Sequence, residues 1–262
     1  MYAFALNAHY VLKKFDDHYS KQQPRMFVIE STATIAPGAF DSIPREIRET
    51  AFLRGSNLTL ISAPEHLSGK QSLVKNNNRF ITTLNDVIIG REKFYEPIIN
   101  SLITKNGPKD ILLFLNGLGV KIQSKSFPVH EETPIPDDFK PYTAIGERRN
   151  VGSGRIQIWF DTSFLPIKMV LENKEGKKFI EYYKNYSVFK TYPHEIEVYT
   201  GNERLLTYTV SSFRPEVIEE ATFDLTPFSS LLSQKIILST IDKKDPVALY
   251  THQLKARYSL KK

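Results

Sequence analysis

The chain has 262 residues, of which 41% are hydrophobic and 24% are charged, and this balance excludes a disordered protein. The absence of cysteine excludes disulfide frameworks, cysteine-ligated zinc sites and thiol nucleophiles. No stretch approaches the roughly 20 apolar residues that a membrane-spanning helix needs. We therefore expect one folded domain over residues 1–262.

The net charge of +6 is unevenly distributed. Residues 235–262 hold seven lysines and arginines against Asp242 and Asp245, so this tail alone carries +5. It is either a solvated terminal face or a surface that contacts anionic lipid or an acidic partner. Nucleic acid is not an expected partner, because the basic residues elsewhere are balanced by acids and no recognised binding motif is present.

The N-terminal half predicts a helix followed by strands. Residues 7–19 have helical apolar spacing, with Asn7 as the N-cap. The apolar positions of this helix are Tyr10, Val11, Phe15 and Tyr19. Strand-like segments follow at residues 27–35, 49–54, 57–62, 72–74 and 79–84.

The middle of the chain predicts two helices and a long loop. Residues 94–104 form a helix begun or kinked at Pro97. Residues 109–118, KDILLFLNGL, are apolar on every side, so we expect this helix either to be buried against the sheet or to cover a pocket there. Residues 120–149 contain the proline-rich stretch 127–141, which favours a loop between two halves of the sheet.

Residues 154–210 are the strongest signal in the chain. Five segments with period-2 alternation and short breaks predict an antiparallel meander with one apolar face. Something apolar has to cover that face. Beyond the meander, we expect a strand at residues 219–224, a short helix at 227–237 and a closing segment at 249–260.

The catalytic and cofactor motifs are mostly absent from the sequence. Residues 68–71 lack the full pattern of a phosphate-binding loop, and residues 152–154 lack the spacing of a nucleophile elbow. The six histidines are scattered without metal-ligand spacing. We expect no enzyme, no metal and no cofactor; convergence of His130, Asp137 and a serine hydroxyl in a cleft would reopen the enzyme hypothesis.

One long stretch resembles a known family. GRIQIWFDTSFLPIKMVLENKEGKKFIEYYKNY is similar to a segment of the outer-membrane lipoprotein carrier family (LolA/LolB-like). AFLRGSNLTLIS, SLVKNNNRFITTL and KDILLFLNGL resemble its earlier strands and its cavity helix, with glycine where the family usually has proline after the arginine. The resemblance covers residues 3–225, and residues 226–262 form a basic extension packed on or flanking the domain. The residues that carry it are Arg54, Trp159, Asp161, Leu165, Pro166, Gly176 and Phe179.

The resemblance implies an α+β fold, a strongly curved antiparallel sheet that forms an unclosed β-barrel with helices in its concave face. It also implies a periplasmic or outer-membrane-anchored carrier that shields acyl chains, as in lipoprotein sorting. Its partners would be the acyl chains of lipids or lipoproteins and a membrane-anchored donor or acceptor protein. The sequence begins without a signal segment, so export would make it the mature form.

We expect twelve apolar side chains to face the space beneath the sheet and to contact lipid, because burial of acyl chains requires apolar area rather than a catalytic group. They are Phe52, Leu58, Leu60, Phe80, Leu112, Leu115, Ile156, Ile158, Phe160, Ile167, Met169 and Leu171. The alternative is a non-catalytic interaction or sensor protein, in which the protein's own helices fill that space and the rim binds a protein partner.

Overall fold

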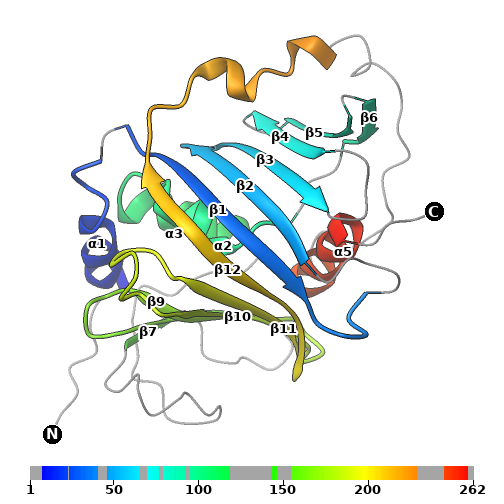
Figure 1. Cartoon of the computed structure of the whole chain (residues 1–262). Helices are drawn as coiled ribbons and strands as arrows, with labels where there is room; N and C mark the ends of the chain where they lie inside the picture. Colours follow the sequence, from blue (N-terminus) through cyan, green and yellow to red (C-terminus); the bar gives the residue numbers. More distant parts are fainter. Residues whose placement is uncertain are drawn as a thin grey trace, which may run out of the picture.

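The computed structural model describes residues 8–22, 24–40, 46–64, 70–76, 79–85, 87–91, 95–118, 143–146, 155–228 and 245–258. They form an α+β fold built on one antiparallel sheet (Figure 1). The predicted fold class is therefore confirmed.

The sheet consists of two six-stranded meanders that meet at their first and last strands. The first meander is β1 (Met26–Ile35), β2 (Glu46–Arg54), β3 (Asn57–Pro64), β4 (Gln71–Asn76), β5 (Arg79–Leu84) and β6 (Val87–Gly90). The second is β7 (Thr143–Gly146), β8 (Arg155–Phe160), β9 (Pro166–Glu172), β10 (Lys178–Lys184), β11 (Glu195–Thr200) and β12 (Glu203–Pro215). β1 pairs with β12, so that, within the described residues, β6 and β7 are the two edges of an open, 12-stranded sheet.

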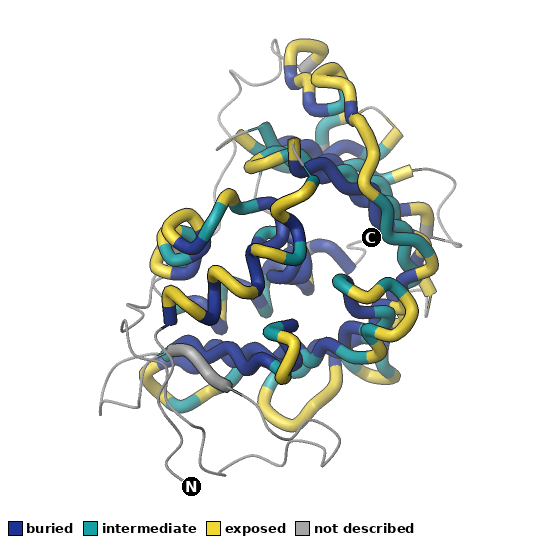
Figure 2. The backbone as a smooth tube through the Cα atoms, turned by 90° about the vertical axis from the view of Figure 1, so that its left-hand side faces the viewer, coloured by how far each residue is buried: buried dark blue, intermediate teal, exposed yellow. Residues whose placement is uncertain are grey.

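The sheet curves around the helices, as Figure 2 shows. The helices among the described residues are α1 (Ala8–Asp17), α2 (Ile98–Ile103), α3 (Pro108–Gly117) and α5 (Pro246–Tyr258), with the 3₁₀ turns η2 (Glu220–Phe223) and η3 (Thr226–Phe228). Buried side chains of all four helices share one core with the concave face of the sheet. The turn η2 packs on the opposite, convex face, where Phe223 contacts Met26 and Val28.

Local sequence explains where the elements begin and end. Gly107 has φ +87°, which glycine adopts without strain, and Pro108 follows at the first position of α3, where its missing N–H costs nothing. Between β8 and β9, the Asp161 carboxylate accepts hydrogen bonds from the backbone N–H groups of Ser163 and Leu165, both at 2.9 Å. This side chain therefore holds the short turn that the second meander needs.

The predicted strand at residues 219–224 is wrong. The segment contains the turn η2 because it has no neighbouring strand: it lies on the convex face of the sheet rather than at an edge. The Thr59 hydroxyl donates to the carbonyl of Thr222 at 2.6 Å, and the Asn76 amide donates to the carbonyl of Phe223 at 3.0 Å. Side chains thus satisfy carbonyls that a strand would pair with backbone.

Two further strands differ from the sequence prediction. β7 lies inside the predicted loop 120–149, where Thr143 to Gly146 pair with Phe160 to Gln157 of β8. β6 pairs with β5 and was not predicted, because its four residues are too short to show alternation. The proline-rich stretch 127–141 and the predicted helix at 227–237, apart from its first two residues, lie outside the described residues.

The apolar helix α3 is less buried than its sequence predicts. Ile111 and Leu115 are fully buried, but the side chain of Leu113 is 60% exposed. Likewise Tyr10 of α1 is 45% exposed, whereas Val11 and Phe15 are buried. Each helix therefore presents one face to the core and another to solvent.

The C-terminal helix α5 is part of the core. Val247, Tyr250, Leu254 and Tyr258 belong to the main cluster with the concave face. Tyr250 packs against Tyr95 and Phe179, with ring centroids 5.8 and 5.4 Å apart. The basic residues of this segment are consequently divided between a buried face and an exposed one.

Candidate functional site: the hollow beneath the sheet

The candidate site is the hollow, which we define as the space between the concave face of the sheet and the helices. Side chains of α2 and α5 occupy it, and the cavity that described residues line between them has a volume of about 20 Å³. Ile29, Glu49, Asn100, Tyr192, Tyr208 and Arg257 are among those lining residues. A cavity of this size has room for no more than about one water molecule, so the hollow as described is filled by the protein itself.

The structure brings most of the predicted lipid-contacting residues together in the hollow. Eight belong to the main core: Leu58, Leu60, Leu115, Ile156, Ile158, Phe160, Met169 and Leu171. Leu112 is partly buried against the same core. Phe80 pairs with Lys75 across β4 and β5, and the Lys75 ammonium lies 6.0 Å from the centre of its ring.

Phe52 and Ile167 lie on the convex face, so their predicted placement in the hollow is wrong. Phe52 pairs with Val28, and both pack with Phe223. Ile167 sits at a register shift between β8 and β9, which turns its side chain to the cluster of Trp159 and Val170. A one-residue irregularity reverses the face of every side chain that it affects, and alternation alone does not reveal it.

A buried carboxylate from β10 anchors α2 in the hollow. Glu181 is fully buried and accepts hydrogen bonds from the hydroxyls of Tyr95 and Tyr183 and from the backbone N–H of Ile98, the last at 3.1 Å. Burial raises the pKa of Glu181 to about 7, because the hydrogen bonds offset only part of the desolvation of the charge and Glu96 adds repulsion. The start of α2 therefore rests on an acid that titrates near neutrality.

A buried ion pair anchors α5. The Arg257 guanidinium pairs with the Glu49 carboxylate of β2 and donates to the backbone carbonyl of Tyr95, and both charged side chains are at most 3% exposed. Glu49 also accepts hydrogen bonds from the hydroxyls of Tyr258 at 3.0 Å and Ser62 at 3.2 Å. The carboxylate is thus fully satisfied, as a buried charge has to be.

A third polar contact joins α2 to the loop between β10 and β11, where the Tyr192 hydroxyl donates to the Asn100 amide oxygen at 2.5 Å. We call these groups the polar seam: Glu49, Tyr95, Asn100, Glu181 and Arg257. Sequence analysis missed the seam, although a signal was present. Glu49 interrupts the apolar row of Ile47, Ala51 and Leu53, and Glu181 interrupts that of Phe179 and Tyr183.

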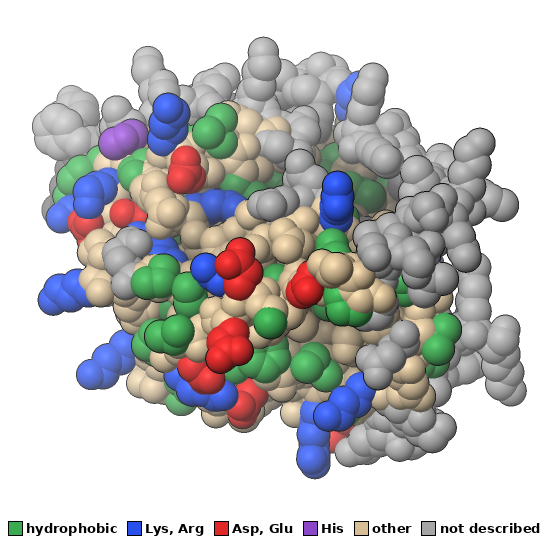
Figure 3. Space-filling model, turned by 90° about the horizontal axis from the view of Figure 1, so that it is seen from above, with side chains coloured by type: hydrophobic (Ala, Val, Ile, Leu, Met, Phe, Trp, Pro, Cys, Tyr) green, Lys and Arg blue, Asp and Glu red, His purple; other side chains and the backbone are tan. Residues whose placement is uncertain are grey.

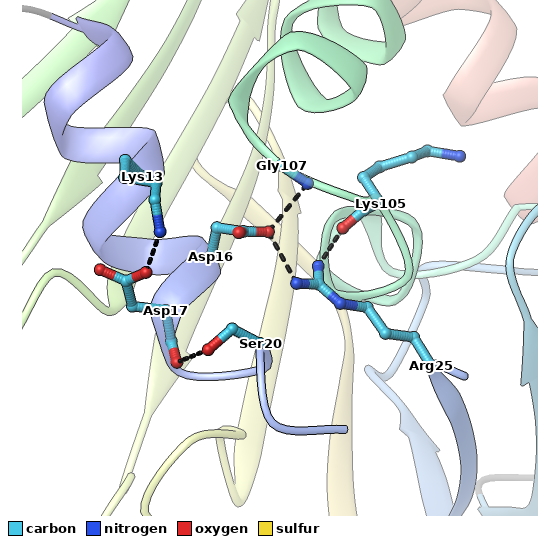
Figure 4. Close-up of polar contacts among 7 residues, drawn as sticks. All are labelled: Lys13, Asp16, Asp17, Ser20, Arg25, Lys105 and Gly107. Atoms are coloured by element: carbon cyan, nitrogen blue, oxygen red, sulfur yellow. Dashed lines mark hydrogen bonds and ion pairs between the residues drawn. The ribbon is translucent and has the colours of Figure 1, made fainter. Parts of the chain in front are cut away.

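A second buried ion pair ties α1 to the loop between α2 and α3 (Figure 4). Asp16 pairs with Arg25 at 2.8 Å and accepts a hydrogen bond from the backbone N–H of Gly107 at 2.9 Å. Arg25 also donates to the carbonyl of Lys105. The neighbouring pair of Lys13 and Asp17 is exposed, so it adds little to stability. The Asp16 contact fixes the position at which α3 begins.

The convex face holds a buried lysine that the hollow does not use. Lys168 is 1% exposed, and its ammonium lies 5.2 Å from the ring centre of Trp159 and 5.1 Å from that of Tyr182. Burial, together with the nearby Lys178, lowers its pKa to about 8. The two aromatic faces stabilise the charge in place of an anion.

Metal-binding clusters are missing from the part of the chain that the structure describes. No group of three histidines and carboxylates there could hold a metal ion, and no helix among the described residues is long and apolar enough to span a membrane. His130 and Asp137, which the enzyme hypothesis would require, lie outside those residues.

The fold and the hollow define a class of architecture: an open antiparallel sheet wrapped around its own helices. No family model and no curated protein matches the chain. Among solved structures, it is similar to the crystal structure of a DUF1329 family protein from Desulfovibrio piger, with a TM-score of 0.48 and 10% identity over 85% of this chain and 99% of that one.

Proposed function

We propose that this protein is a non-catalytic carrier that binds acyl chains beneath its curved sheet, and that α5 is a displaceable occupant of the hollow. The observation that carries the proposal is the polar seam, through which the concave face holds α2 and α5. The resemblance to the lipoprotein carrier family adds the compartment, the periplasm, and a membrane-anchored donor or acceptor.

The polar seam lowers the free energy needed to displace α5 from the hollow. A buried ion pair contributes little net stability compared with an apolar pair of the same volume, because desolvation of the two charges offsets their attraction. When α5 moves out, Glu49 and Arg257 regain water, which lowers the free energy of opening. Sealing the hollow permanently would need only apolar side chains at these positions.

The apolar wall that α5 leaves behind suits an acyl chain. Leu60, Met169 and Leu171 belong to this wall. Their side chains have no hydrogen-bond donor, so the wall contacts the hydrocarbon part of a lipid rather than its polar head group. Burial of a chain gains about 0.8 kcal/mol per methylene, so a long acyl chain provides enough free energy to replace the contacts of one helix.

The proposal predicts saturable binding of a fluorescent fatty acid by the purified protein. We expect Leu60→Arg, which places a charge in the hollow, to abolish binding, and Phe52→Arg on the convex face to leave the affinity unchanged. Circular dichroism controls for folding of both variants. No binding by the wild-type protein, together with no lipid in organic extracts of freshly purified protein, would contradict the carrier function.

A second function is favoured by the small size of the remaining cavity, about 20 Å³. If α5 never leaves, the filled hollow is a rigid core and the protein recognises a partner through its rim. The exposed Leu113 of α3 and the half-buried Phe114 beside it would then contribute to that surface. Failure of fatty-acid binding combined with capture of one defined membrane-anchored protein would support this alternative.

A further inference from the structure

A large open space lies outside the hollow, on the solvent side of α5. This groove has a volume of about 700 Å³. Two β-hairpin turns form one wall, at Gly176 between β9 and β10 and at Gly201 between β11 and β12, and α5 forms the other. The Thr200 and Thr251 hydroxyls link the walls at 3.4 Å.

The charges in this groove are unbalanced. Lys177, Lys178 and Lys255 line it, and among the described residues no carboxylate forms an ion pair with any of these three ammonium groups. Asp245 also lines the groove, but its carboxylate accepts hydrogen bonds from Asn173 at 2.9 Å and from the backbone N–H of Val247 at 2.9 Å. The single acid is therefore occupied in holding the start of α5, and the lysines are left for an anion.

The rest of the surface offers a contrast. On the face seen in Figure 3, acidic and basic side chains are interspersed. Some lysines elsewhere have an acidic partner: Lys184, for example, binds Glu197 at 2.6 Å. The groove thus concentrates one sign of charge in a concave site, where the field on an anion is strongest.

The position of α5 connects the groove to the hollow. Ala248, Thr251 and Lys255 on one side of this helix line the groove, while Tyr250 and Leu254 on the other side pack in the hollow. One helix therefore separates an apolar compartment from a cationic one. An amphiphile with an anionic head group has this same division of chemistry.

We infer that the groove binds the phosphate-bearing head group of an anionic phospholipid at a membrane surface, beside the helix that acyl chains displace. This inference rests on the proposed function and adds the class of lipid. While α5 is in place, Lys177 in the turn between β9 and β10, Lys178 at the start of β10 and Lys255 on α5 hold the head group from both walls.

Vesicle flotation tests the inference. The variant Lys177→Gln, Lys178→Gln, Lys255→Gln is compared with a charge-matched control, Lys21→Gln, Lys70→Gln, Lys109→Gln, whose lysines are exposed and outside the groove. The vesicles contain phosphatidylcholine with or without phosphatidylglycerol. A lysine at an anionic surface contributes about fivefold to binding, so we expect the groove variant to lose tenfold or more on phosphatidylglycerol vesicles and the control to lose little.

Two outcomes would overturn the inference. Equal losses in both variants would mean that net charge alone attracts the protein. Inorganic phosphate that blocks binding where chloride of the same ionic strength does not would assign the groove to a soluble phosphate. Fatty-acid binding measured in parallel separates this inference from the proposed function, because the neutralised groove leaves the apolar wall intact. Either of these outcomes in a protein that still binds the fatty acid contradicts the head-group site alone, whereas absence of fatty-acid binding by the wild-type protein contradicts the carrier.

Discussion

Replacing Arg257 by methionine is expected to reduce the free energy of unfolding by about 3–5 kcal/mol, because the change leaves the Glu49 carboxylate buried without its cation. The carboxylate is 2% exposed, and its remaining donors are the hydroxyls of Tyr258 and Ser62. The carbonyl of Tyr95 loses a donor as well. Urea denaturation measures the loss.

Two further variants control this test: a matched exposed arginine, and a double variant that removes both charges of the buried pair. Arg214→Met removes an exposed arginine that pairs with Glu30 at 2.9 Å and Glu216 at 2.8 Å, and we expect it to cost less than about 1 kcal/mol. The double variant Glu49→Met, Arg257→Met should recover most of the stability lost in Arg257→Met, since it removes both charges. A double variant as unstable as the single one would show that the packing of α5, rather than its charge, is responsible.

Glu181 should make the protein more stable in mild acid than in mild alkali. Its pKa is raised from 4.5 in the unfolded chain to about 7 in the fold. The folded state therefore holds the proton more tightly, so the stabilisation is complete below the unfolded pKa and is lost as the pH rises through the folded one. The difference corresponds to about 3 kcal/mol between about pH 4.5 and pH 7.

Glu181→Gln isolates this contribution. Glutamine keeps the shape and remains neutral, so we expect unfolding free energies measured across that pH range to decline in the wild-type protein and to decline by about 3 kcal/mol less in the variant. Contributions that the two proteins share cancel in the comparison. Parallel pH profiles for the two proteins would contradict the raised pKa.

Strands β8 to β12 of the second meander were predictable from the sequence because their evidence is local. Apolar and polar residues alternate along much of residues 155–200, and the breaks after β8 and β9 are short turns with signals of their own, such as Gly176 with φ +79°. The pairing of β1 with β12 is not local. It joins residues far apart in the chain, and no alternation pattern identifies which strand is the neighbour.

The polar seam was not predictable for the same reason. The hydroxyl of Tyr95 and the carboxylate of Glu181 come from positions 86 residues apart, and Glu49 and Arg257 from positions 208 apart. Buried polar residues also explain why the sequence did not predict α5 as a helix. Arg257 and Gln253 are buried beside Leu254, so the buried face of α5 is not a continuous apolar stripe. The sequence indicated an apolar concave face, but not how the face holds the helices that cover it.

The displacement of α5 can be tested by locking it in place. The chain has no cysteine, and the hydroxyls of Thr200 on β11 and Thr251 on α5 are 3.4 Å apart, so Thr200→Cys with Thr251→Cys introduces a single cysteine pair at this contact. The direct measurement is the affinity of the double variant for a fluorescent fatty acid in its oxidised and reduced forms. If acyl chains take the place of α5, the oxidised form binds at least about tenfold more weakly, and reduction restores the wild-type affinity. Equal binding by both forms would show that acyl chains do not enter where α5 lies.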